Sequence, residues 1–264
     1  MAYKMKHKIS IIITTFQRVH LLRWGLYSLS LQNIPWDFET IVINDGVDDE
    51  SEEVCNLYKD KLHLKYVFSG QRNLNKESTW RVPGFAINIG VKQSSGDILV
   101  LCCAEMLHIN PTIPRLTLPI LENPKLLGIP LGKDDRDGAF LDCIERNSGV
   151  FDLDTLNRCA NLYTKMPFLM ALHRNEYFEI GGYDEDFIGI AYDDRDFMDR
   201  LLRNGCDYCQ TEAVAVHLYH PRAEGYYEGE GPSAWDYNKN LFFSRMGQIV
   251  RNQGREWGRL DEVQ

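Results

Sequence analysis

The sequence predicts an α/β fold with a doubly wound, mainly parallel β-sheet. Over roughly the first 105 residues, short runs rich in β-branched side chains alternate with segments of helical periodicity. Nearly continuous apolar runs of this kind are typical of strands that are buried on both faces of a parallel sheet. Of the 264 residues, 44% are hydrophobic and 25% are charged, which is the composition of a folded globular chain.

Strands and helices are expected to alternate in this first part of the chain. Strands are predicted at residues 9–15, 40–44, 64–68 and 97–102. Helices are predicted from the spacing of apolar residues at 21–30, 54–58 and 85–91. The second helix follows an acidic stretch, which suits a helix N-terminus. This alternation indicates a doubly wound sheet.

The second part of the chain is expected to complete the fold and to end in a helical tail. Its predicted elements are a helix at 113–121, a strand at 168–172, a short helix at 174–180 and a strand at 213–218. The proline-rich stretch from 110 to 166 otherwise predicts loops and short strands. A helix over 193–204 begins with acids and ends with arginines and Asn204-Gly205. A last helix is expected over 235–250, behind a glycine-rich patch at 225–231.

Charge and cysteine content exclude several classes of protein. A net charge of −9 argues against a chain that holds nucleic acid by its backbone. No apolar run approaches the ~20 residues of a membrane span. The apolar stretch near the N-terminus is too short for a signal peptide, so we expect a cytoplasmic protein. Cys206 and Cys209 have CxxC spacing, but no second such pair accompanies them, so reduced thiols are expected rather than structural zinc.

Polar residues follow three of the predicted strands, at the edge where doubly wound sheets bind ligands. The first strand ends in residues 14–18, and the second ends at Asp45. Asp45 can accept hydrogen bonds from a ribose or a base, or it can simply belong to an Asn-Asp-Gly turn. The strand at 97–102 leads to Glu105, which can bind a divalent cation together with a diphosphate. The alternative for Glu105 is an exposed acid at a strand end.

Two further groups carry candidate chemistry. Asp194 lies three and four residues before Phe197 and Met198, so it is expected on the core side of its helix. A partly buried carboxylate has a raised pKa and suits general-base catalysis, although acids at a helix start also simply complement the helix dipole. His217 and His220 are candidate metal ligands, and their spacing suggests that one of them is structural.

Several common motifs are absent from the sequence. It contains no Gly-x-Ser-x-Gly elbow, no P-loop and no GxGxxG. This argues against an elbow-type serine hydrolase, P-loop phosphoryl transfer and NAD binding of the GxGxxG type.

Taken in chain order, the motifs resemble those of inverting glycosyltransferases of the GT-A fold, in particular family 2. The run ISIIITTFQR at 9–18 is similar to the opening strand and nucleotide loop, and VINDG at 42–46 is similar to the second strand. Ala86-x-Asn88-x-Gly90 and the turn at 95–98 lead to the DxD position, which here reads Cys103-Ala104-Glu105. GGYDEDF at 181–187 and DDRD at 193–196 resemble an acceptor-side motif that galactosyltransferases share.

The resemblance implies a GT-A domain over residues 1–222, with a nucleotide-sugar-binding half at 1–105 and an acceptor and catalytic half at 106–222. Residues 223–264 would be a flexible segment and a C-terminal helix that could close as a lid. The expected activity is transfer of a sugar from a nucleotide-sugar, by default UDP-linked, to an acceptor hydroxyl with inversion. Mn²⁺ or Mg²⁺ would assist, and the acceptor would be a glycan, a lipid-linked sugar or a protein.

Residue roles follow from the same resemblance. Asp194 would be the general base, with Asp193 beside it. The donor would contact Thr15, Phe16, Arg18, Asp45, Arg72, Arg81, Asn88, Cys103 and Ala104. The metal would be bound by Glu105 with His217 or His220, and the acceptor would contact Gly182, Asp184 and Trp235.

Cys103 departs from the family pattern, because a cysteine replaces the first acid of DxD. Metal affinity could then be weaker, or the metal dispensable. Three other functions are therefore considered. A nucleotidyltransferase would have a glycine-rich loop after the first strand, and residues 14–18 contain no glycine. A non-catalytic nucleotide-sugar or glycan binding module is the main alternative, and purely structural acidic clusters are the third.

Overall fold

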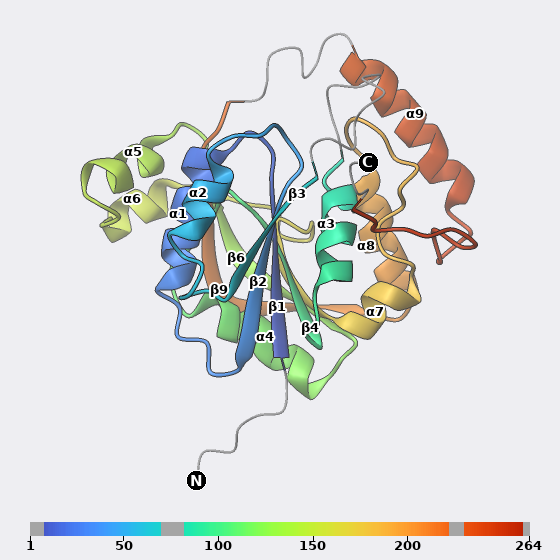
Figure 1. The fold of residues 1–264 in the computed structure, drawn as a ribbon, viewed down its shortest axis with the longest axis horizontal. Helices are drawn as coiled ribbons and strands as arrows, with labels where there is room; N and C mark the ends of the chain where they lie inside the picture. Colours follow the sequence, from blue (N-terminus) through green and yellow to red (C-terminus); the bar gives the residue numbers. More distant parts are fainter. Residues whose placement is uncertain (1–7, 70–81, 222–229, 261–264) are drawn as a thin grey trace.

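The computed structural model describes residues 8–69, 82–221 and 230–260 of the chain. Its centre is one mixed sheet in the order β3-β2-β1-β4-β8-β6-β9-β5 (Figure 1). The first four of these strands are parallel and match the predicted ones: β1 (Lys8–Thr15), β2 (Asp37–Asn44), β3 (Leu64–Phe68) and β4 (Ile98–Cys103). The predicted α/β fold is confirmed, and its parallel character holds in this half.

The second half of the sheet is mixed rather than parallel. β8 (Leu169–His173) runs antiparallel to β4, and β6 (Leu126–Asp134) runs antiparallel to β8. β9 (Asp207–His217) pairs in parallel with β6, while β5 (Met106–His108) and β7 (Ala160–Asn161) add short antiparallel edges to β9 and β6. The second half of the sheet therefore joins the parallel half through an antiparallel strand.

Strand β6 was not predicted, because its sequence looks like a loop. It contains Pro130 between two glycines, Gly128 and Gly132. The pairing of β6 with β9 shifts register between Ile129 and Leu131, so the proline lies at a bulge, where a missing N–H is tolerated. At Gly128 a side chain would overlap the main chain of Leu116, so the helix that follows β5 can pack closely there.

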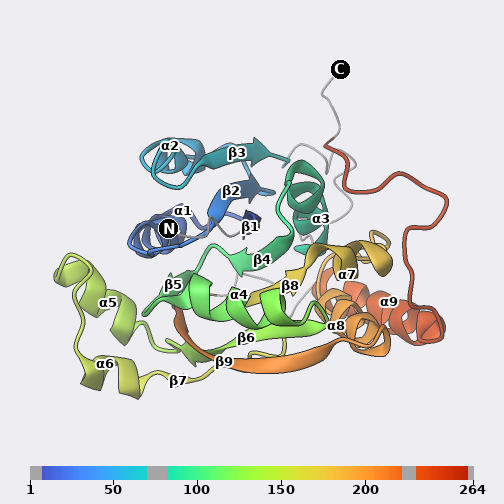
Figure 2. The same cartoon turned by 90° about the horizontal axis from the view of Figure 1, so that it is seen from below.

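Helices cover both faces of the sheet (Figure 2). One face packs against α1 (Val19–Ser30), α2 (Ser51–Asn56) and α4 (Thr112–Glu122). The other packs against α3 (Gly84–Gln93), α7 (Arg174–Glu179) and α8 (Asp193–Arg203). α5 (Ala139–Arg146) and α6 (Leu153–Arg158) form a small separate cluster with Leu218 of the strand-end loop. The apolar residues of β1 alternate between the two faces, which explains their nearly continuous run.

The C-terminal part is a packed element of the fold. α9 (Glu230–Arg245) begins and ends five residues earlier than predicted, at 230 rather than 235 and at 245 rather than 250. The chain then runs back over α7, where the main-chain N–H of Arg251 donates to the carbonyl of Ile180 at 3.0 Å. Lys92 lies 3.9 Å from the ring centre of Trp257. Most of the glycine-rich patch at 225–231 lies outside the described residues.

The cysteines and the apolar character of the helices also bear on the sequence expectations. All seven cysteines are free thiols, and Cys206 is buried while Cys209 is partly exposed in β9. In the described ranges, no helix combines the length and the apolar character that crossing a membrane requires.

Candidate active site

A cleft of about 940 Å³ opens at the carboxyl ends of β1, β2 and β4. It is the site that a doubly wound sheet predicts, because parallel strands there leave a crevice between their end loops. The structure brings most of the predicted residues to this cleft: Thr15, Phe16, Arg18, Asp45, Cys103, Glu105, Asp193, Asp194, His217, His220 and Trp235.

Asp45 faces the cleft because its neighbour makes the turn. The side-chain oxygen of Asn44 accepts the main-chain N–H of Gly46 at 3.0 Å, so the Asx turn belongs to Asn44. Asp45 is nearly buried, and its Oδ1 accepts the hydroxyl of Ser69 at 2.6 Å. Of the two readings of this motif, the structure favours a carboxylate held at the cleft.

Three buried polar atoms beside the cleft have no hydrogen-bond partner among the described residues. They are Thr15 Oγ1, Arg18 Nε and Asp193 Oδ2. Buried polar groups in folded proteins are nearly always paired, by protein, water or ligand. Two donors and one carboxylate oxygen around one cleft therefore indicate a polar ligand.

Glu105, His217 and His220 form a candidate metal centre. One ligand atom from each lies within 4.8 Å of the other two. His217 Nε2 is 3.9 Å and His220 Nε2 is 3.4 Å from Glu105 Oε1. Both histidines lie near Glu105 although their spacing is three, because β9 ends at His217 and the chain then turns.

The protonation states in this cluster suit a divalent cation. Burial by itself would raise the pKa of Glu105, but the hydrogen bond to His220 and the two imidazoles lower it, so the carboxylate is charged. Burial lowers the pKa of His217 in spite of the nearby acids, so this imidazole is neutral at pH 7. A carboxylate and a neutral imidazole are the forms that bind metals.

Asp134 orients His217 and was missed by the sequence analysis. Its Oδ1 lies 3.4 Å from His217 Nδ1, on the side away from Glu105. An Nδ1–H that points at a carboxylate leaves the lone pair on Nε2, which is the usual second shell of a metal-bound histidine. Asp134 ends β6 directly opposite His217 in the register with β9. Predicting β6 would therefore have found it.

His220 has a weaker claim to the metal. Its Nδ1 lies 3.1 Å from Arg18 Nη2 and 3.2 Å from the carbonyl of Pro221. Since arginine only donates, accepting from Arg18 keeps the His220 proton on Nε2, which faces Glu105. Metal binding through Nε2 requires the other tautomer, in which Nδ1–H donates to Pro221. His217 is the stronger ligand of the two.

Asp193 and Asp194 begin α8 and line the same cleft. Asp194 Oδ1 accepts the hydroxyl of Tyr183 at 3.0 Å. Burial raises the pKa of Asp194 to about 6, although the Tyr183 hydrogen bond opposes this shift. Burial and the neighbouring Asp194 also raise the pKa of Asp193. The expected partial burial and raised pKa of Asp194 are both present, which suits a general base near neutral pH.

Comparison with known proteins decides the family. Residues 10–178 match the family model described as glycosyl transferase family 2, which is more than half of the chain. The chain belongs to glycosyl transferase family 2. Residues 159–223 also match a model described as the N-terminal domain of galactosyltransferase, and these include the acceptor-side motif at 181–196. The resemblance drawn from the sequence motifs is confirmed.

Curated relatives of this family 2 chain are distant and longer. It is 24% identical over 250 residues to chondroitin synthase of Escherichia coli, covering 82% of this chain and 35% of that protein. It is 27% identical over 234 residues to validoxylamine A glucosyltransferase of Streptomyces hygroscopicus subsp. limoneus, covering 75% and 48%. The chain thus spans about a third to a half of the length of these relatives.

Solved structures share the fold. GalNAc-T7 with UDP, GalNAc and Mn²⁺ superposes with a TM-score of 0.61 at 15% identity, covering 92% of this chain and 53% of that one. The mannosyltransferase PcManGT from Pyrobaculum calidifontis, in complex with GDP-Man and Mn²⁺, gives a TM-score of 0.55 at 16% identity, covering 90% and 62%. Both are GT-A enzymes, so the predicted GT-A architecture is confirmed.

Cys103, which the sequence motifs align with the first DxD acid, lines the cleft of this family 2 chain. Burial and the charge of Glu105 raise the pKa of its thiol well above the ordinary value. The group is therefore a neutral thiol rather than an anionic ligand. Ala104 beside it is buried and reaches β1 through its main-chain N–H, which donates to Thr14 O at 3.0 Å, so its side chain does not line the cleft.

Asn88 and Gly182 do not reach the cleft, which corrects their predicted roles. Asn88 is fully buried, and its amide bonds to the hydroxyl of Tyr177 and to both main-chain polar groups of Tyr183. Gly182 has φ +68°, and a side chain there would overlap Asn88 and Trp257. Asn88 and Gly182 therefore shape the turn at residues 181–183 and do not contact the cleft.

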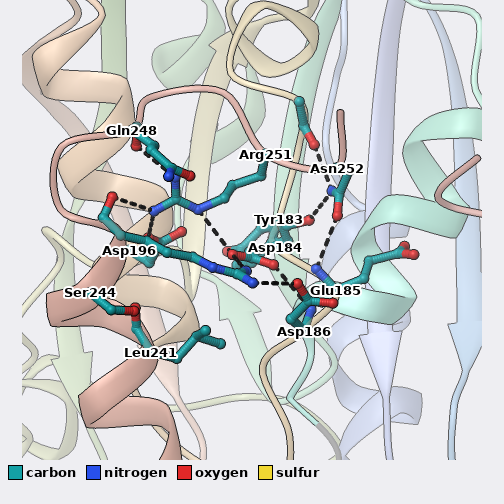
Figure 3. A network of polar contacts seen from close by, with 12 residues as sticks. Tyr183, Asp184, Glu185, Asp186, Asp196, Leu241, Ser244, Gln248, Arg251 and Asn252 are labelled. Atoms are coloured by element: carbon teal, nitrogen blue, oxygen red, sulfur yellow. Dashed lines mark hydrogen bonds and ion pairs between the residues drawn. The ribbon is translucent and has the colours of Figure 1, made fainter. Parts of the chain in front are cut away.

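Asp184 is also placed away from the cleft, because arginines neutralise it (Figure 3). Its Oδ2 lies 2.6 Å from Arg245 Nη1 and 2.9 Å from Arg251 Nε. Arg251 also reaches Asp196 Oδ1 at 2.8 Å, and Arg200 reaches Asp196 Oδ2 at 2.6 Å. The predicted role of Asp184 in acceptor binding is not supported by this geometry.

Trp235 is the remaining predicted site residue that lies within the described residues. Trp235 on α9 borders the cleft with its ring edge-on to Tyr192, at 5.6 Å between ring centres, which is compatible with an acceptor contact. Arg72 and Arg81 lie outside the described residues.

Proposed function

We propose that this chain transfers a sugar from a UDP-sugar to an acceptor hydroxyl with inversion at the anomeric carbon, assisted by a divalent cation. One observation carries the proposal. A single cleft is lined both by a metal-ligating cluster and by a carboxylate whose pKa is about 6. Membership of glycosyl transferase family 2 and the GT-A fold support the same chemistry.

The nucleoside would bind over the ends of β1 and β2. Thr15 and Arg18 offer buried donors that lack partners among the described residues, and Asp45 offers a carboxylate. Phe16 borders the same space and can pack against a base. UDP is the nucleotide in structural neighbours such as GalNAc-T7 and TarS, whereas PcManGT binds GDP-Man. A panel of donors therefore belongs in the first experiment.

Glu105 and His217 would hold the cation, with His220 as a further ligand in its other tautomer. When bound, the metal would neutralise the charge that develops on the leaving diphosphate. A set of imidazoles and one carboxylate suits Mn²⁺ better than Mg²⁺, which prefers oxygen ligands. We therefore expect Mn²⁺ to support activity more strongly.

Asp194 would remove the proton from the acceptor hydroxyl as that oxygen attacks the anomeric carbon. A pKa of about 6 leaves this carboxylate mostly ionised at pH 7 and still basic enough to accept a proton. A direct displacement of this kind inverts the anomeric centre and needs no enzyme nucleophile. Asp193, whose Oδ2 has no partner among the described residues, would orient an acceptor hydroxyl.

The test is release of nucleoside diphosphate from UDP-hexoses, UDP-N-acetylhexosamines and GDP-mannose with Mn²⁺, with oligosaccharide acceptors or with water alone. Asp194→Asn should lower turnover by at least ~10²-fold. Calorimetric binding of UDP with Mn²⁺ should stay unchanged, because Asp194 does not belong to the metal cluster. The matched control is Asp199→Asn, five residues further along α8, whose partner is Arg203.

The outcomes separate catalysis from simple binding. Near-normal turnover in Asp194→Asn would remove this residue from the mechanism. If the wild-type chain binds UDP with Mn²⁺ but releases no nucleotide from any donor, the non-catalytic binding module that Cys103 leaves open becomes the better explanation.

A further inference from the structure

Tyr183 forms a side-chain hydrogen bond with Asp194. Its hydroxyl donates to Asp194 Oδ1 at 3.0 Å. Burial raises the pKa of Tyr183 well above its ordinary value, so the hydroxyl keeps its proton and acts as a donor. The Tyr183 side chain is fully buried, so water does not compete for this bond.

The ring of Tyr183 has no room to move. It stacks on Phe197 of α8, with ring centres 4.1 Å apart and planes 6° from parallel. A β-carbon at Gly84 would overlap the Tyr183 ring, so only glycine allows the start of α3 to pack this closely. The hydroxyl is therefore fixed relative to the first turn of α8, because the stacking partner Phe197 lies on that same helix.

The main chain of Tyr183 is fixed as well. Asn88 of α3 accepts the Tyr183 N–H at 2.9 Å and donates to its carbonyl at 3.0 Å. Asn252, from the segment after α9, donates to the same carbonyl at 2.7 Å. Two asparagines from distant parts of the chain thus hold one residue of the turn.

We propose that Tyr183 is the positioning residue of Asp194: it holds the carboxylate in the orientation that an acceptor hydroxyl must meet. This inference rests on the proposed function of Asp194 as the base. It also explains why the turn at 181–183 is so heavily bonded, since a loose turn would let the hydroxyl drift from Asp194. A residue that acts on Asp194 alone should change turnover and leave donor binding intact.

The surroundings of Asp194 allow the effect of Tyr183 to be isolated. Among the described residues, the other titratable groups that interact electrostatically with Asp194 are Asp193 on the same helix and Cys103 on β4, and Cys103 is a neutral thiol. Arg195 lies over the rings of Tyr192 and Phe242, towards α9. Removing the hydroxyl of Tyr183 therefore takes away the contact that favours the ionised form of Asp194.

The test compares Tyr183→Phe with Tyr177→Phe. Both residues are fully buried and both pack against Phe197, but the Tyr177 hydroxyl donates to Asn88 instead. Nucleotide release with saturating Mn²⁺ should show kcat about 3- to 10-fold lower in Tyr183→Phe, with an unchanged donor KM. The acid limb of kcat should move up by about half to one pH unit. Tyr177→Phe should leave the acid limb where it is.

Several outcomes would overturn the inference. One is an unchanged kcat and acid limb in Tyr183→Phe while Asp194→Asn remains inactive. Another is the same change in both tyrosine variants, because that would mean general loosening of the aromatic cluster. Melting temperatures of both variants report whether the fold survives. Failure of the proposed function looks different, because Asp194→Asn would then match the wild type.

Discussion

Two pairs of aspartates lie close together in the sequence and differ in everything around them. Asp184 and Asp196 are buried against arginines, with ion-pair distances of 2.6–2.9 Å. Asp193 is buried and Asp194 is partly buried at the cleft, and none of the described residues forms an ion pair with either of them. The first pair is held in the packing by arginines, whereas the proposed function uses the second pair at the cleft.

The difference lies in where cations arrive from distant parts of the chain. Arg245 and Arg251 come from the end of α9 and the segment after it, at least 55 residues beyond the acids that they neutralise. Charges placed in a poorly solvated site stay ionised only where a partner compensates them. Position in an acidic motif therefore does not distinguish a structural acid from a functional one, whereas the presence of an arginine does.

The largest expected effect comes from removing the shared cation. Arg251→Met removes a buried positive charge that pairs with both Asp184 and Asp196. The loss should lower the free energy of unfolding by about 3–5 kcal/mol. For a chain of this size, that lowers the melting temperature by roughly 10 °C. Thermal unfolding followed by circular dichroism measures it.

Arg255→Met is the matched control. Arg255 pairs with Asp186 at 2.6 Å and more loosely with Asp184 at 3.8 Å, and its side chain is 39% exposed. An exposed pair contributes at most about 1 kcal/mol. Equal destabilisation by the two substitutions would contradict the distinction between the buried and the exposed pairs.

The candidate metal centre provides a second test, because the acid Asp134 there has His217 as its partner instead of an arginine. Asp134→Asn should weaken Mn²⁺ binding about 10- to 100-fold, since the amide no longer holds the Nδ1 proton of His217 as strongly. Titration calorimetry with Mn²⁺ and UDP measures the affinity.

The control for Asp134 is its neighbour. Asp135 lines the same cleft, but its carboxylate caps α5 by accepting the N–H groups of Phe140 and Leu141. Asp135→Asn should therefore leave Mn²⁺ affinity largely unchanged. An equal loss of Mn²⁺ affinity in both variants would mean that Asp134 acts only through its negative charge.

The donor side of this molecule was more predictable than the rest, for a physical reason. β1, β2 and β4 are buried on both faces, so their apolar runs are continuous and their carboxyl ends identify Asp45 and Glu105. β6 was missed because Pro130 lies at a bulge, and Asp134 was missed with it. The role of Asp184 was wrong because its partner Arg251 approaches only through tertiary packing.

Replacing one aspartate of each pair by asparagine should change the stability of the fold in opposite directions, by smaller amounts. The folded state raises the pKa of Asp194 to about 6, so the fold loses stability as pH rises from about 4 through 6. Asp194→Asn removes that cost and should stabilise the protein by about 1–2 kcal/mol at pH 8 and by nothing at pH 4. Asp196→Asn should destabilise it, because Arg200 and Arg251 lose their buried partner. Melting curves at both pH values decide, and destabilisation by both substitutions would contradict the comparison.

The finest distinction concerns the pH dependence of turnover. If Asp194 is the base, kcat should fall about tenfold per pH unit below pH 6, because protonation removes the acceptor of the proton. Protonation of His217 would also reduce activity at acid pH, by releasing the metal. The two causes differ in their response to Mn²⁺, since metal competes with protons for His217 and not for Asp194. An acid limb that stays in place as the Mn²⁺ concentration rises assigns it to Asp194, and one that moves to lower pH assigns it to His217.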